Sequence, residues 1–241
     1  MKAILTYHSV DESGSVISTD PAVFAGQMRW LSSSGVSVVA VKDILTSEHD
    51  RDAVALTFDD AFTNFLMGAW PLLRDHGFPV TLFVPTSYAG RSNHWDSLPG
   101  GPMQTLPILD WNSLGSLADQ GVELGAHSRS HPDMRNLTDE EVETEIAGSL
   151  EDIERETGII PRGFAYPYGR HDDRVVQIAG QYCDWACTTQ LRHLEVTDDR
   201  YRLPRLDSFF LRGPARISQY GTPLFRSYLS LRNTVRQARG R

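Results

Sequence analysis

The feature that most constrains the fold of this chain is the alternation of short apolar runs with longer amphipathic stretches. The apolar runs have the length of buried strands and cover residues 3–7, 37–41, 53–58, 80–84, 122–126, 164–166 and 185–188. Between them, helical spacing of apolar residues predicts helices at 24–35, 65–76, 114–120, 138–157 and 172–181. Strands that alternate with helices are typical of parallel βα units. About seven strands favour a barrel over an open sheet, although periodicity alone does not separate the two.

The clearest helix is the one at 138–157. Thr138 with Glu141 forms a capping box, and Val142, Ile146 and Ile153 keep one apolar face. We therefore expect this helix to begin directly after Thr138.

The bulk composition is that of one ordinary globular domain. The chain has 241 residues, of which 40% are hydrophobic and 22% charged. Its formal net charge of −8 argues against a protein that wraps a nucleic-acid backbone. Cys183 and Cys187 are too few for a disulfide framework, so we interpret them as reduced, partly buried thiols.

The first residues lack the apolar core of about 7–15 residues that a signal peptide needs. No stretch approaches the ~20 apolar residues of a membrane span. We therefore expect a cytoplasmic protein.

The end of the chain is basic. Residues 208–241 contain seven Arg and no Asp or Glu, which leaves about −15 on the remainder. We divide the chain into a main domain at 1–210 and a basic, helical tail at 211–241. The tail is interpreted either as a helix packed on the acidic main domain or as an amphipathic segment in weak peripheral contact with an anionic membrane.

Polar residues that can bind a metal follow two of the predicted strands. Asp59 and Asp60 follow an apolar run, and His127 and His131 lie four residues apart after another. Catalytic groups gather at the carboxyl ends of strands in a (β/α) barrel. The His spacing allows both imidazoles to reach one divalent ion. Each motif alone also fits a turn or a helix cap.

A third motif, Tyr-Pro-Tyr-Gly at 166–169, ends another predicted strand. Its proline and glycine give a rigid turn whose backbone can approach a ligand closely, although such a motif alone is commonly structural.

Together these motifs resemble the polysaccharide deacetylases of carbohydrate esterase family four, over roughly residues 3–207. The resemblance implies a distorted, incomplete (β/α) barrel of about seven strands. It implies that Asp60, His127 and His131 bind the metal, that Asp59 is the catalytic base, and that the backbone N–H of Tyr168 holds the oxyanion. Two imidazoles and one carboxylate suit Zn²⁺, and also accept Co²⁺, Ni²⁺, Fe²⁺ or Mn²⁺.

The sequence departs from the commonest family pattern in three places. Ala61 follows the Asp pair where glycine is usual. No Arg precedes the Pro-Tyr turn, and Arg205 is the candidate to orient Asp59, with a distant structural salt bridge as the alternative. No His follows His193 to serve as the acid.

For the acid we favour His8, because the N-terminal Tyr-His resembles a subgroup that includes the deacetylases of poly-N-acetylglucosamine export. His8 ends a predicted strand and would lie on the same barrel edge. A structural role for His8, or His171 as the acid, are the alternatives.

The function predicted from these motifs is metal-dependent removal of N-acetyl groups from a GlcNAc-like amino sugar in a polysaccharide, oligosaccharide or glycolipid. The same residues would also serve an O-acetyl esterase or another amidase. A non-catalytic carbohydrate-binding member is a further alternative. The loop at 88–107 contains His94 and Trp95, which makes it a candidate lid and Trp95 a candidate for stacking on sugar.

Overall fold

The computed structural model of the chain describes residues 1–46, 51–96, 104–213 and 215–238. The strands are β1 (Lys2–Tyr7), β2 (Ser9–Val10), β3 (Ser18–Thr19), β4 (Ser37–Val38), β5 (Ala53–Phe58), β6 (Val80–Val84), β7 (Glu123–Ala126), β8 (Gly163–Ala165), β9 (Trp185–Cys187) and β10 (Arg205–Asp207). The α-helices are α1 (Pro21–Ser33), α2 (Val41–Thr46), α3 (Trp70–Asp75), α4 (Trp111–Asp119), α5 (Asp139–Thr157), α6 (Asp173–Tyr182) and α7 (Pro223–Ala238). Short helical turns are η1 (Phe65–Ala69), η2 (Thr86–Tyr88), η3 (His94–Asp96), η4 (Met134–Asn136), η5 (Pro167–Gly169), η6 (Ser208–Leu211) and η7 (Ile217–Gln219).

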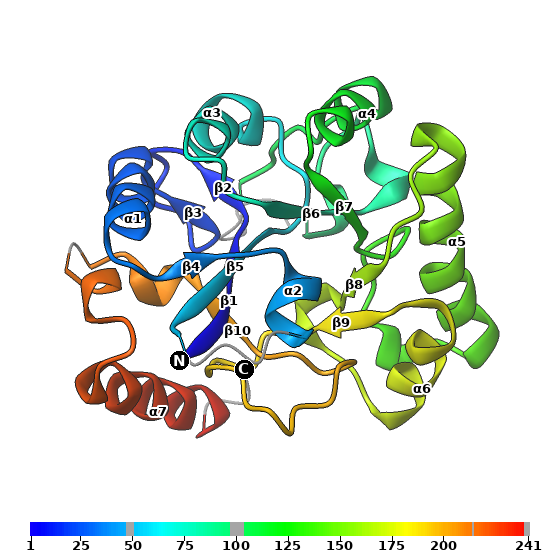
Figure 1. Ribbon diagram of the computed structural model, residues 1–241. Helices are drawn as coiled ribbons and strands as arrows, with labels where there is room; N and C mark the ends of the chain where they lie inside the picture. Colours follow the sequence, from blue (N-terminus) through cyan, green and yellow to red (C-terminus); the bar gives the residue numbers. More distant parts are fainter. Residues whose placement is uncertain (47–50, 97–103, 214, 239–241) are drawn as a thin grey trace.

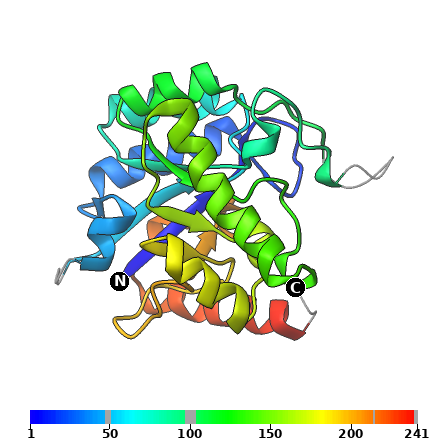
Figure 2. The ribbon, with the colours of Figure 1, turned by 90° about the vertical axis from the view of Figure 1, so that its right-hand side faces the viewer.

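Seven parallel strands form a nearly closed barrel in the order β10, β1, β5, β6, β7, β8, β9 (Figure 1). The two ends of this series meet where Cys187 in β9 pairs with Leu203, just before β10. The helices surround the ring, with α5 and α6 on one flank and α7 beneath them (Figure 2). The predicted (β/α) barrel of about seven strands is confirmed. The capping box of Thr138 and Glu141 at the start of α5 is confirmed as well.

The interior of the barrel is filled by side chains that alternate with those packed under the helices. The largest of them are Phe83 and Trp185, and both need glycine on the neighbouring strands. A Cβ at Gly125 would lie 2.6 Å from the Phe83 ring, and one at Gly163 would lie 2.2 Å from the Trp185 ring. These two glycines therefore allow aromatic rings to fill the barrel.

Helix α2 covers the amino-end opening of the barrel. Val41 and Ile44 pack with interior residues such as Phe83 and Trp185. The prediction of a strand at 37–41 was therefore wrong in part, because only Ser37–Val38 pairs with β5 and the chain turns into α2. The valine-rich run resembles a strand, but Val41 is used as the first inward residue of a helix.

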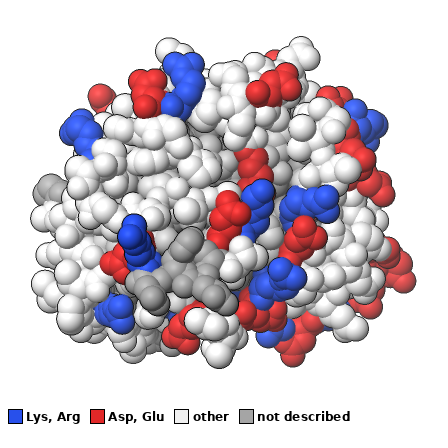
Figure 3. Space-filling view, in the orientation of Figure 1, with Lys and Arg blue, Asp and Glu red and all other residues white. Residues whose placement is uncertain are grey.

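Charges of both signs are mixed over the face of the molecule drawn in Figure 3. Lys and Arg side chains lie there beside Asp and Glu side chains. An attraction between this face and a charged partner would therefore be local, because neighbouring charges of opposite sign offset one another at distance.

Part of the basic tail packs against the barrel through helix α7. Phe225 and Leu229 are buried in the main hydrophobic cluster, whereas Leu224 and Leu231 are exposed. Residues 239–241 of the predicted tail, and the side chain of Arg236, lie outside the described residues. Within the described part of the chain, no helix combines the length and apolar character that crossing a membrane requires. Peripheral membrane contact stays a prediction.

If the tail does contact an anionic membrane, the exposed Arg226 and Arg232 should carry much of the attraction. Each Arg near such a surface contributes about 1 kcal/mol at low salt, so changing both to Gln should weaken binding to phosphatidylserine vesicles by roughly 30-fold. Sedimentation with vesicles at low and high salt measures this, with neutral phosphatidylcholine vesicles as the control. Equal partitioning of the two proteins would eliminate the membrane interpretation.

Candidate metal centre

Asp60, His127 and His131 meet at the carboxyl-end edge of the barrel. Asp60 follows β5, His127 follows β7, and His131 lies in the turn after it. All three side chains are buried, and each offers one donor atom within 4.8 Å of the other two. Among the described residues this is the group of His, Cys, Asp and Glu that could hold a metal ion.

The distances in this group fit a shared ion better than direct contact. Nε2 of His127 and Nε2 of His131 each lie 3.6 Å from Oδ1 of Asp60. That separation exceeds a hydrogen bond. It is near the ~3.3 Å between ligand atoms of one tetrahedral Zn²⁺ with bonds of about 2.0–2.1 Å.

The protonation states also suit a metal. Burial and the neighbouring His127 hold the pKa of His131 well below its ordinary value, so the imidazole is neutral and can donate a lone pair. Nδ1 of His127 lies 2.7 Å from the carbonyl oxygen of Ala165. A proton on Nδ1 makes this contact a hydrogen bond. The lone pair of Nε2, on the side of the ring near Asp60, is then available to a metal ion.

The backbone of the three site turns takes an uncommon conformation. Within the described residues, the non-glycine residues with positive φ are all in these turns: Asp60, Ala61, Ser128, His131 and Tyr168. A left-handed conformation costs of order 1–3 kcal/mol for such residues, so surrounding contacts must hold the turns in place.

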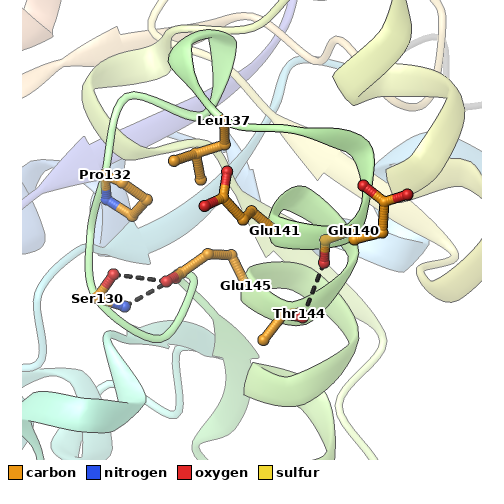
Figure 4. Close-up of a pocket in the computed structure, with 7 residues that line it drawn as sticks. All are labelled: Ser130, Pro132, Leu137, Glu140, Glu141, Thr144 and Glu145. Atoms are coloured by element: carbon orange, nitrogen blue, oxygen red, sulfur yellow. Dashed lines mark hydrogen bonds between the residues drawn. The ribbon is translucent and has the colours of Figure 1, made fainter.

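The turn that carries both histidines is held from helix α5 by Glu145. One carboxylate oxygen of Glu145 accepts hydrogen bonds from the backbone N–H groups of Arg129 and Ser130, both at 2.8 Å. The other accepts from the Ser130 hydroxyl at 2.5 Å. Figure 4 shows Glu145 joined to Ser130 by hydrogen bonds, and both residues line a pocket of about 290 Å³ beside this turn. Two turns further along α5, Asp152 forms a two-bond ion pair with Arg129.

Removing the Glu145 carboxylate should therefore loosen the metal group without touching a ligand. We expect Glu145→Ala to weaken metal affinity by roughly 10–100-fold, the usual scale for groups that orient metal ligands. Competition with a chelator measures this. Glu140→Ala is the matched control, because the exposed Glu140 lines the same pocket. Unchanged affinity in Glu145→Ala would show that the turn keeps its shape without the carboxylate.

Asp59 is held by a buried arginine from the far end of the chain. Nη1 and Nη2 of Arg205 each lie 2.7 Å from one oxygen of Asp59, in a two-bond ion pair. Nε of Arg205 also donates to the carbonyl of Thr188 at 2.9 Å. The structure thus places the candidate Arg205 directly on Asp59.

This ion pair sets the charge of Asp59. Burial alone would raise the pKa of Asp59, but the charge of Arg205, followed by His127 and the Arg205 hydrogen bonds, holds it well below its ordinary range. Asp59 is therefore ionised at neutral pH.

The two candidate acids lie in different surroundings. Nε2 of His8 is 3.7 Å from Oδ2 of Asp59, and the side chain is 20% exposed. Nδ1 of His171 lies 2.9 Å from the carbonyl oxygen of Gly169, and its ring stacks on Tyr166. The structure therefore brings His8 close to the Asp59 carboxylate. It places His171 against the turn at 166–169.

Tyr168 lines a cleft beside the metal group. Its ring meets His131 edge-on at 4.6 Å between centroids, and its backbone has φ 58°. The cleft has a volume of about 670 Å³, and its walls include the aromatic rings of Tyr88, Trp95 and Tyr168. His131 is also among the residues that line it. The role of residues 88–107 as a lid stays a prediction, and 97–103 lie outside the described residues.

The carboxyl-end edge of the nearly closed (β/α) barrel thus carries a buried Asp-His-His group and, beside it, the separate carboxylate of Asp59. The sequence pattern of the polysaccharide deacetylases matches residues 46–182, which is more than half of the chain. The chain belongs to the polysaccharide deacetylase family. The matched segment contains Asp59, Asp60, His127, His131 and Tyr168, whereas His8 and Arg205 lie outside it.

Related proteins carry matching names. The Bacillus subtilis protein YxkH, named as a polysaccharide deacetylase, is 25% identical over 185 residues, covering 73% of this chain and 60% of that protein. The poly-beta-1,6-N-acetyl-D-glucosamine N-deacetylase of Staphylococcus epidermidis is 21% identical over 197 residues, covering 76% of this chain and 65% of that protein. The chain thus spans less than two thirds of the length of these relatives.

Solved structures support the fold. The deacetylase PplD of Streptococcus pyogenes, in complex with acetate, superposes with a TM-score of 0.77 at 20% identity, covering 92% of this chain and 98% of that one. IcaB from Ammonifex degensii superposes with a TM-score of 0.73 at 21% identity, covering 89% and 95%. At this level of identity the likeness concerns the barrel itself.

Proposed function

We propose that this chain is a metal-dependent N-deacetylase that acts on a GlcNAc-like amino sugar in a polysaccharide, oligosaccharide or glycolipid. The observation that carries the proposal is the ionised Asp59, held by Arg205, beside the buried group of Asp60, His127 and His131. Membership of the family and the N-deacetylase name of the staphylococcal relative support it.

The metal proposed for Asp60, His127 and His131 is Zn²⁺, and the same donors also accept Co²⁺, Ni²⁺, Fe²⁺ or Mn²⁺. When bound, such an ion polarises the acetyl carbonyl and lowers the pKa of a water molecule.

Asp59 is proposed as the general base. Its carboxylate is buried and ionised, and each of its oxygens accepts one short hydrogen bond from Arg205. A carboxylate oxygen has a further lone pair that can take a proton from water. The ion pair with Arg205 fixes the direction of these lone pairs, because the two-bond geometry holds the carboxylate plane.

The other two roles belong to Tyr168 and His8. The Tyr168 backbone is proposed to donate its N–H to the developing oxyanion, supported by its place beside His131 at the edge of the cleft. His8 is proposed to protonate the departing amine, supported by its partly exposed ring near Asp59. An amine leaves poorly unless it receives a proton, so this step needs a nearby acid.

The acid role gives a specific result for His8→Ala. We expect this variant to keep its metal and to lose about 10²-fold in kcat on an N-acetyl substrate, the usual scale for removing a general acid. Activity on 4-nitrophenyl acetate should fall much less, because nitrophenolate leaves without protonation. His171→Ala is the matched control. Equal losses on the amide and the ester would contradict the assignment.

Release of acetate together with a new free amine tests the proposed function. The purified chain, with and without each divalent metal, would be given N-acetylglucosamine oligomers of increasing length and a lipid-linked N-acetylated sugar. Acetate release with equal amine formation is the expected result. Acetate release from acetylxylan without amine formation would indicate an O-acetyl esterase instead. Sugar binding without acetate release from either substrate would indicate a non-catalytic member.

A further inference from the structure

The two histidines of the metal group are oriented in different ways. His127 is fixed by the contact of its Nδ1 with the carbonyl of Ala165. Nδ1 of His131 is buried and has no hydrogen-bond partner in the part of the chain that the structure describes. Metal-binding histidines are usually oriented by a hydrogen bond from the second ring nitrogen. Something else must therefore limit rotation of the His131 ring.

Aromatic rings pack against His131 where a hydrogen bond is missing. The indole of Trp95 stacks on the imidazole with 4.5 Å between ring centroids and 27° between planes. Tyr168 contacts the same imidazole edge-on, with centroids 4.6 Å apart and an interplanar angle of 72°. A flat ring on one face and an edge against it leave the imidazole little freedom to turn about its Cβ–Cγ bond.

Trp95 is itself supported on two sides. Tyr88 meets the indole edge-on at 4.7 Å between centroids. Two residues before Trp95, the buried Asn93 binds the opposite side of the loop: its Oδ1 accepts from the backbone N–H of Leu106 at 2.6 Å, and its Nδ2 donates to the carbonyl of Gln104 at 3.2 Å. Hydrogen bonds of Asn93 therefore hold the loop, and packing against Tyr88 holds the indole.

We propose that Trp95 is a positioning residue for the metal centre, which orients the His131 imidazole by stacking in place of a hydrogen bond. The inference rests on the proposed function, because it takes His131 as a metal ligand. It assigns to the loop that contains Trp95 a part in metal binding, in addition to its part in the wall of the cleft.

The test compares metal affinity among variants of the full chain at position 95. Trp95→Phe keeps a flat ring, whereas Trp95→Leu fills space without one. We expect Trp95→Leu to bind Zn²⁺ on the order of tenfold more weakly than the wild type, and Trp95→Phe to recover most of the loss. The absorption spectrum of bound Co²⁺ should change in Trp95→Leu and stay close to wild type in Trp95→Phe. Trp111→Leu, at a partly buried tryptophan that begins α4, is the matched control.

The outcomes separate this inference from the proposed function. Wild-type Zn²⁺ affinity and an unchanged Co²⁺ spectrum in Trp95→Leu, with a raised KM for the sugar, would overturn the positioning role and leave Trp95 as a wall of the cleft. A loss of affinity that Trp95→Phe does not recover would also overturn it, because the flat ring would then not be the cause. Failure of the wild type to bind any of the metals would instead refute the proposed function.

Discussion

Replacing His127 with alanine should leave a folded protein that binds no stoichiometric metal and releases no acetate. His127 supplies one of the three donors around the candidate site, and the other two cannot hold a divalent ion tightly in competition with water. The change also removes the contact with the carbonyl of Ala165 that orients the imidazole. Metal content after dialysis, measured by mass spectrometry, gives the first result. A second measurement of metal binding is the melting temperature on adding Zn²⁺. It should rise for the wild type and not for His127→Ala, because an ion that binds the folded state stabilises it.

The control for this variant is His76→Ala, at the end of α3, which should keep full metal content and activity. Circular dichroism of the His127 variant would show whether the barrel is intact. A folded His127→Ala protein with wild-type metal content would exclude His127 as a ligand.

Changing Asp59 to asparagine should give the second large effect, with the opposite pattern for the metal. We expect near-normal metal content and a fall in kcat of about 10²–10⁴-fold, because the amide cannot accept the proton of water as a carboxylate does. Loss of the metal from Asp59→Asn would mean that the two aspartates have roles other than those proposed.

The same change should lower stability, because it leaves the guanidinium of Arg205 buried without its counter-charge. Breaking a buried ion pair from one side costs about 3–5 kcal/mol of the free energy of unfolding. The double variant Asp59→Asn, Arg205→Met removes both charges and should recover much of that loss while remaining inactive. Denaturant unfolding and acetate release, measured on the same samples, separate the two effects. Recovery of activity in the double variant would show that Asp59 is not the base.

The fold could be predicted from the sequence because each βα unit of a parallel barrel has the same pattern of apolar residues. Buried strands and amphipathic helices repeat along the chain, and the strand ends bring Asp59, Asp60 and His127 to one edge. The pattern is weaker where elements are short. Strand β10 has three residues and helix α2 has six, so neither is long enough to repeat its period along the chain.

The contacts around the site were harder to predict than its central residues. Arg205 could be proposed as a partner of Asp59, but only the closure of the barrel brings together residues separated by 146 positions. Glu145 was not predicted from the sequence, although its spacing from Asp152 is a signal. The two acids lie seven residues apart, which puts them on one face of the predicted helix, and both contact the turn that carries the histidines. Trp95 was considered only for stacking on sugar, because no local pattern reveals that it packs on His131.

The filled interior of the barrel has a consequence for the order in which products leave. Phe83 and Trp185 occupy the barrel below Arg205, and α2 covers the amino end, so these described residues close the amino-end side of the barrel toward Asp59. Under the proposed function, we therefore expect acetate and the deacetylated sugar to depart at the carboxyl end, through the opening by which the substrate entered. The acetyl group would lie deeper than the sugar that carries it, so the sugar departs first and acetate last. Acetate would therefore bind the same enzyme form as the substrate and compete with it directly.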